Sequence, residues 1–144
     1  MEKTRKHLKE ISIVILILAA FSLIRSVVDV IFTDFSQASR LEGATPGLIL
    51  ATQIFLIVFA FVLMIPEIYV GAKGIKIANA LSSSKAPIVW AVILAIFSGF
   101  AVISSVSSLI QQGDLVGDLL ALADKVVDVL LYITYINYAK KLIK

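Results

Sequence analysis

Four long apolar runs, separated by short polar joints, dominate the pattern of residues along the chain. They cover residues 11–32, 48–70, 87–110 and 115–138. Each run exceeds the ~20 residues that a helix needs to cross ~30 Å of hydrocarbon. A single segment in lipid satisfies its backbone hydrogen bonds only as a helix. The pattern therefore predicts an all-α, polytopic membrane protein, a four-transmembrane-helix bundle that forms one domain over residues 1–144.

Helix-breaking residues stand in the joints between these runs. They are Gly43, Pro46 and Gly47 before the second run, Gly71, Gly74 and the serines at 82–84 before the third, and Gly113 before the fourth. Glycine, proline and serine between apolar segments are typical of turns and loops. We therefore expect the second helix to end near Val70.

The composition agrees with a protein whose solvent is lipid. Hydrophobic residues make up 60% of the chain, against about 45–50% in soluble domains. There is no cysteine and a single histidine, His7, which excludes disulfides and a thiolate or histidine metal site, so no metal or cofactor is expected. The net charge of +3 does not indicate nucleic-acid binding, because the basic residues flank apolar runs instead of interleaving with aromatic ones.

The basic residues also predict how the chain lies in the membrane. Ten Lys and Arg residues lie before the first run, between the second and third, and after the fourth, whereas Arg40 alone occupies the other two joints. Cytoplasmic loops are rich in Lys and Arg, so we expect a multi-pass protein of the cell membrane with both termini cytoplasmic. The first run is not followed by a small-residue cleavage site, and we expect it to be retained.

The fourth run carries charges where a membrane span should have none. Asp118, Asp124, Lys125 and Asp128 lie within an arc of about 120° of a helix, together with Asp114 at its start. Each charge costs about 3 kcal/mol at the centre of a bilayer, more than the apolar residues of this run return. The segment could lie flat on the membrane, but its Lys-rich end would then stay outside, so we favour a span that inserts with its neighbours.

A second polar stripe lies on the first run and includes Arg25 and Asp29. At ~1.5 Å per residue, Arg25 and Asp124 reach the same depth below the outer surface, which predicts an ion pair between them, with Asp128 as the alternative partner of Arg25. Gln53 of the second run lies at a similar depth. Lys125 can also reach Asp128 on its own helix, at a spacing of three residues.

The charges in the outer half of the predicted bundle form one cluster with more carboxylates than cationic groups. The carboxylates are Asp29, Asp118, Asp124 and Asp128, and the cationic groups are those of Arg25 and Lys125. Three interpretations of this cluster remain open. The charges form an ion-pair network that holds the bundle together, a cation or proton pathway, or a docking face for another membrane protein. Glu67, which follows Pro66 near the inner surface, is expected to lie at the interface near Lys73 or the N-terminal lysines instead.

The third run has no charge between residues 86 and 113. Ala91, Ala95 and Gly99 recur at four-residue spacing and form a ridge of small residues. Such ridges allow close approach of another helix in lipid, so these three residues are predicted helix-packing positions.

No nucleotide loop, zinc-binding helix or nucleophile motif occurs, so we do not expect an enzyme. The leading hypothesis is a small non-enzymatic accessory protein that binds a membrane partner, or protects against a membrane-active agent in the manner of an immunity protein, through the polar faces of its first and fourth helices. The alternative is a small oligomeric channel or transporter coupled to cations or protons, which uses the acidic stripe. A second copy of the chain is a possible partner under either hypothesis.

Overall fold

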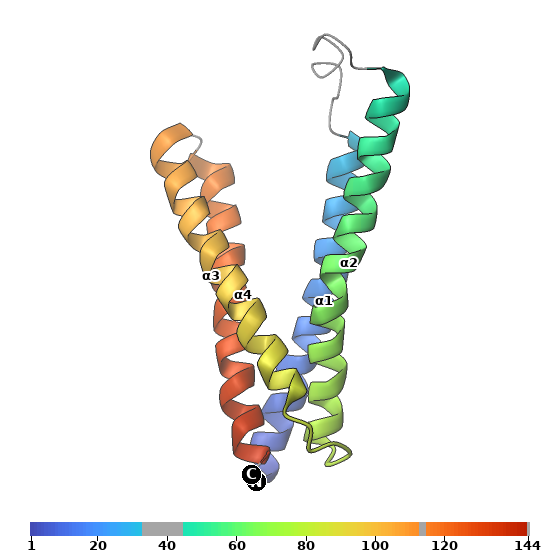
Figure 1. Cartoon of the computed structure of the whole chain (residues 1–144). Helices are drawn as coiled ribbons and strands as arrows, with labels where there is room; N and C mark the ends of the chain where they lie inside the picture. The colour runs from blue at the N-terminus through green and yellow to red at the C-terminus, as the bar shows by residue number, and fades with distance from the viewer. Residues whose placement is uncertain (33–44, 113–114, 144) are drawn as a thin grey trace. The chain divides into compact units, whose positions relative to one another are not determined.

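The computed structural model describes residues 1–32, 45–112 and 115–143, without the side chains of residues 112, 115, 117 and 118. The described residues form α1 (Glu2–Phe32), α2 (Pro46–Ala78), α3 (Ala86–Gln112) and α4 (Leu115–Leu142), shown in Figure 1. All regular structure in this part of the chain is helical, which confirms the all-α prediction. Among these residues, α1, α2 and α3 are long and apolar enough to cross a membrane.

The helices extend beyond the apolar runs on which they were predicted. The helix α1 begins at Glu2, so the basic segment before the first apolar run is helical as well. The helix α2 continues to Ala78 and contains both Gly71 and Gly74. The expectation that these glycines end the second helix is therefore wrong. They lie buried inside α2, where their missing side chains leave room for α1 and α4.

Local capping explains where α2 and α3 begin. The Thr45 hydroxyl accepts a hydrogen bond from the Leu48 backbone N–H at 3.3 Å, and Pro46 takes the first helical position, where no N–H partner is needed. The Ser84 hydroxyl likewise accepts from the Ala86 N–H at 3.3 Å, where α3 begins. Both caps use residue types that the joints between apolar runs supply.

A Schellman-type turn ends α2. The Leu81 N–H donates to the Lys76 carbonyl at 2.7 Å, and the Ala80 N–H donates to the Ile77 carbonyl at 3.0 Å. This turn needs a left-handed residue, and Ala80 takes that position with φ of 59°. Glycine is the usual residue there, because a Cβ atom in this conformation costs energy.

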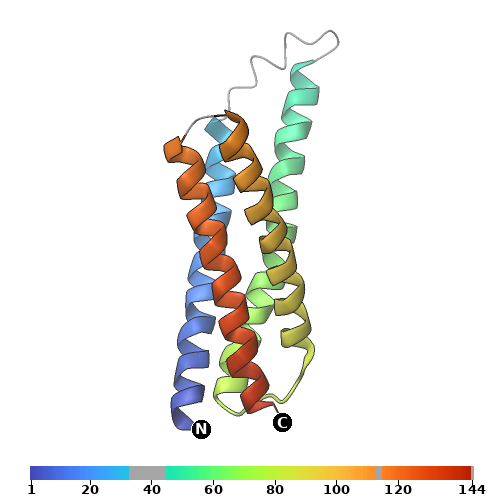
Figure 2. The same ribbon diagram turned by 90° about the vertical axis from the view of Figure 1, so that its left-hand side faces the viewer.

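The described helices divide into two compact units. One unit comprises Met1–Leu16 and Pro66–Lys144, and the other comprises Ile17–Ile65. In α2 the boundary falls at Pro66, which lacks the backbone donor that would bond the preceding turn. In the first unit α4 packs along α3, and its C-terminal end lies beside the N-terminal end of α1 (Figures 1 and 2).

The core of the first unit lies where all four helices contribute residues. Its buried members are Leu8, Ile15, Val70, Ile77, Ala78, Ala91, Tyr132, Tyr135 and Ala139. They come from the start of α1, the end of α2, the start of α3 and the end of α4. These parts of the helices are therefore fixed relative to one another by close packing, which positions the site described next.

Candidate functional site

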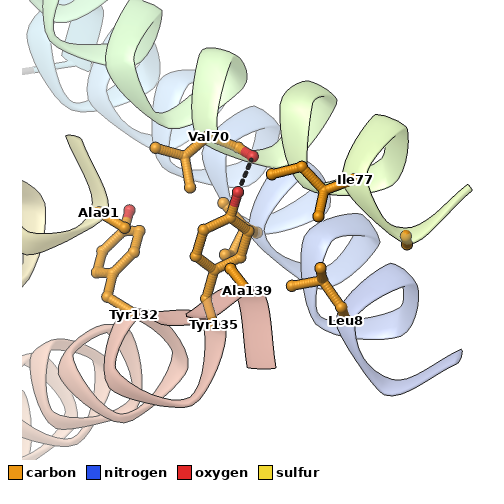
Figure 3. Close-up of a cluster of buried hydrophobic side chains, with 9 residues drawn as sticks. Leu8, Val70, Ile77, Ala91, Tyr132, Tyr135 and Ala139 are labelled. Atoms are coloured by element: carbon orange, nitrogen blue, oxygen red, sulfur yellow. Dashed lines mark hydrogen bonds between the residues drawn. The ribbon is translucent and has the colours of Figure 1, made fainter. Parts of the chain in front are cut away.

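Tyr135 connects α4 to α2 inside the first unit. Its side chain is completely buried, and its hydroxyl donates a hydrogen bond to the Val70 carbonyl oxygen at 3.1 Å (Figure 3). A buried tyrosine hydroxyl needs an acceptor, and here the backbone of a neighbouring helix supplies it. The C-terminal half of α4 is thereby fixed against α2.

Gly74 is the point at which α1, α2 and α4 come closest together. A Cβ atom at this position would collide with the Ser12 Oγ of α1 and would lie 2.5 Å from the Tyr135 Cε2 of α4. Ser12 is itself buried, and its hydroxyl donates to the Leu8 carbonyl at 2.7 Å within α1. Three helices therefore share a contact that only a glycine at position 74 accommodates.

Gly71 brings α1 and α2 together one turn earlier. A Cβ atom there would lie 2.6 Å from the Leu16 Cγ and 3.1 Å from the Ser12 backbone oxygen. Glycines three or four residues apart let helix backbones approach closely in lipid. The two glycines of α2 thus form the small-residue contact surface that joins α2 to α1.

A polar cluster lies next to this core, between α2 and α4. The Lys125 Nζ lies 4.0 Å from the Asp128 Oδ2, with the aspartate side chain 25% exposed. Glu67 of α2 interacts electrostatically with both residues, and the buried Tyr132 interacts with Glu67 and Asp128. Asp124, one turn before Asp128, also contributes to the field at this aspartate. Three carboxylates and the Lys125 ammonium group thus contribute to one electrostatic field.

Glu67 is the residue of this cluster that the sequence analysis placed elsewhere. It was expected near Lys73 or the N-terminal lysines, but the charges that act on it are those of Asp128 and Lys125 of α4, and the Lys73 Nζ lies 5.8 Å from the centroid of the Tyr69 ring. The hydrogen bond from Tyr135 to Val70 pairs positions of α4 and α2 that are 65 residues apart. With the same offset, Glu67 of α2 lies level with Tyr132 of α4. The second and fourth apolar runs start at residues 48 and 115, on the same predicted surface, which gives an offset of 67 residues and approximates this register to within two residues.

The polar stripe of the first apolar run lies in the other unit. The Arg25 Nε and the Asp29 Oδ2 are 3.9 Å apart on α1, and their side chains are 65% and 69% exposed. Gln53 of α2 is half-buried in the same unit. Asp124 belongs to the first unit, so the pair predicted between Arg25 and Asp124 stays a prediction.

Two further predicted polar residues cannot be assigned contacts. Asp114 lies outside the described residues, and Asp118 lies in α4 with its side chain outside them.

The small residues of α3 differ in their surroundings. Ala91 is completely buried in the core, where Figure 3 shows it next to the Tyr132 ring, and Ala95 packs against this core. A Cβ atom on Gly99 would meet nothing within 4 Å. The first two positions of the ridge therefore lie at a helix contact within the chain, and Gly99 faces open space.

Two further sources of information on function are possible metal-binding groups and similarity to known proteins. No group of three or more His, Cys, Asp or Glu residues that could hold a metal ion occurs among the residues that the structure describes. Comparison of the chain with protein-family models, curated proteins and solved structures found no match.

Proposed function

We propose that α4 is a fourth membrane span and that both termini are cytoplasmic. Two observations support this topology. The N-terminal part of α1 and the C-terminal part of α4 pack in one core, through Leu8 and Ala139 among others, so both ends of the chain lie on one side. The basic residues gather at this same end, as expected for a cytoplasmic surface. Scanning accessibility of cysteines introduced at Glu2 and Lys141 tests the topology, and opposite accessibility of the two positions contradicts it.

The protein's function, on our proposal, is to bind a membrane partner as a small non-enzymatic accessory or protective protein. The observation that carries this proposal is the exposure of the Arg25–Asp29 pair on a helix apolar enough to span a membrane. The Arg25 Nε and the Asp29 Oδ2 lie 3.9 Å apart, and both side chains are more than half exposed. A protein surface that covers them would remove their contact with hydrocarbon.

The size of this effect is large enough to drive a specific contact. A charged residue at the centre of a membrane helix costs about 2.5–3.5 kcal/mol, and pairing lowers the cost only in part. Polar contacts between helices in lipid contribute about 0.6 kcal/mol on average, and they depend on geometry. The pair on α1 therefore supplies specificity, and the surrounding apolar surface supplies contact area.

Copurification in a mild detergent tests this proposal. The double substitution Arg25→Leu with Asp29→Leu removes the polar face without leaving one charge alone, and we expect it to abolish recovery of the partner. Thr52→Val is the matched control, because the hydroxyl of this exposed residue of the same unit donates within its own helix, to the Leu48 carbonyl at 2.9 Å. A monomer that carries no partner, in the native chain as in the variants, would contradict the proposal. For a protective role, the measurement is the resistance of cells with and without the chain to membrane-active agents, and equal resistance would contradict that role.

The polar cluster around Glu67 favours a second candidate function, an oligomeric pathway for cations or protons. Glu67 of α2 adds a third carboxylate to Asp124 and Asp128 of α4, in the field of the Lys125 ammonium group. An excess of carboxylates in a low-dielectric site attracts a cation or a proton, and rings of carboxylates select cations in channels. Oligomerisation would complete a pathway that four helices seldom enclose alone.

Flux measurements in proteoliposomes distinguish this candidate from partner binding. We expect Glu67→Gln and Asp124→Asn each to abolish proton or cation flux while the purified protein keeps its helicity. The matched control is Glu10→Gln, which removes a carboxylate outside the apolar runs, where it contacts His7 at 3.3 Å. Absence of flux in folded native protein refutes the pathway and leaves the cluster as a contact between helices.

A further inference from the structure

The end of the first unit that carries the chain's N-terminus contains a basic cavity. Its volume is about 670 Å³, and its polar lining consists of Lys3, Arg5, Lys6, Lys9 and Glu2 from α1 and Asn79 from the end of α2. Four cationic side chains therefore face one carboxylate around the same space. The first turn of α1 adds backbone N–H groups that have no partner within the helix. The chemistry of this lining selects an anion with several acceptor oxygens.

The depth of the cavity matches the headgroup layer of a bilayer. Lys9 lies two residues before the first apolar run begins at Ile11, which is about 3 Å along a helix, and Lys6 lies about 8 Å from it. The polar layer on each face of a bilayer is about 5–7 Å thick. Lys9 therefore lies within this layer and Lys6 at its outer edge, and their long side chains bring both ammonium groups to the level of the lipid phosphates.

An adjoining cavity gives the anion an apolar neighbour. This second space has a volume of about 340 Å³ and shares Arg5 with the first. Its other walls include the apolar side chains of Ile77, Leu81 and Leu142 and the serines Ser82 and Ser83. A phosphate group that carries a glycerol and an acyl chain can use both the hydroxyl and the apolar walls, whereas a free phosphate ion gains nothing from the apolar walls.

We propose that the basic cavity binds the headgroup of an anionic glycerophospholipid, of the phosphatidylglycerol class, from the adjacent leaflet. Lys6 and Lys9 bind the phosphate, and Arg5, between the two cavities, donates to the phosphate and to the glycerol oxygens. The lipid then occupies the groove between the start of α1 and the end of α2. This site is separate from the polar cluster on α2 and α4, and it does not depend on either proposed function.

Native mass spectrometry of the purified full-length chain, titrated with phosphatidylglycerol and with phosphatidylcholine, tests the proposal. A charge exchange, Lys9→Glu with Glu10→Lys, moves one cation out of the cavity and keeps the net charge of the chain. Each basic residue at an anionic surface changes binding by a factor of about five, so we expect phosphatidylglycerol retention to fall about 5- to 30-fold. Retention of phosphatidylcholine should not change.

A matched control and a second, milder variant accompany this exchange. The exchange Glu2→Lys with Lys3→Glu keeps every charge within the cavity lining, and we expect near-native retention of phosphatidylglycerol. Lys6→Gln, a milder change that leaves α1 intact, should weaken retention about fivefold. Equal retention in the native chain and the Lys9→Glu variant overturns the proposal, as does an equal loss in both exchanges. Displacement of the lipid by equimolar glycerol phosphate overturns it as well, because the cavity would then bind a soluble phosphate ester without the acyl chain of a lipid.

Discussion

The contact at Gly74 leads to a quantitative prediction for a single added methyl group. Replacing Gly74 by alanine places a Cβ atom against the Ser12 hydroxyl and 2.5 Å from the Tyr135 ring. The Ser12 side chain can rotate, but the Tyr135 ring is held against α2 by its hydrogen bond to the Val70 carbonyl. The ring must therefore move, and the hydrogen bond must lengthen, before the methyl group fits.

The expected free-energy change combines three effects. Overpacking of a core costs about 1–3 kcal/mol, and loss of a buried hydrogen bond costs about 1 kcal/mol. Alanine in place of glycine in a helix contributes about 1 kcal/mol in the opposite direction. The sum is a destabilisation of about 1–3 kcal/mol for Gly74→Ala.

Gly99→Ala is the matched control, since it makes the same chemical change at a helical glycine. A Cβ atom at position 99 meets nothing within 4 Å, so this variant should gain the helix preference and stabilise the protein by up to about 1 kcal/mol. The two variants should thus differ by about 2–4 kcal/mol. Unfolding by sodium dodecyl sulfate in mixed micelles, followed by circular dichroism, measures this difference. Stabilisation by both substitutions would refute the close contact of α1, α2 and α4.

Three further predictions concern the same unit and use the same unfolding measurement. Tyr135→Phe removes the hydrogen bond to the Val70 carbonyl and should lower the free energy of unfolding by about 0.5–1.5 kcal/mol, whereas an unchanged value would show that this bond contributes nothing. Ser12→Ile should cost about 2 kcal/mol or more, because the buried Oγ already fills the space above position 74, while Ser22→Ile on the exposed face of α1 should be tolerated. Ala80→Gly should stabilise the chain by about 1 kcal/mol, since φ of 59° suits glycine, and a destabilised variant would contradict the left-handed turn.

Much of the fold followed from the apolar pattern alone. A run of apolar residues longer than ~20 has one backbone solution in lipid, so the existence and order of the four helices could be predicted before any contact was known. The predicted start of the third and fourth runs, at residues 87 and 115, agrees with the helix bounds to within one residue. The start of the first helix and the end of the second were less well predicted, because Lys-rich and glycine-containing segments carry no apolar period.

The polar stripe on the fourth run could also be read from spacing, since residues three and four apart share a helix face. Lys125 and Asp128 lie within 4.0 Å on this face in the structure. The position of Glu67 of α2 relative to these two residues could not be predicted from spacing. Whether Glu67 faces Lys73 on its own helix or α4 depends on the rotation of α2 about its axis, which a nearly uniform apolar surface does not specify.

The sequence by itself determined the number of helices, their order and the separation of basic from apolar surface, because these depend on the length and composition of local segments. Only the tertiary structure decided the roles of Gly71 and Gly74. In isolation each is a helix breaker, but the cost of glycine in a helix is about 1 kcal/mol, less than the packing that a close helix contact provides. The same glycine is therefore a loop residue or a contact residue according to which helix lies against it, and that information resides in Ser12 and Tyr135, 62 residues before and 61 residues after it.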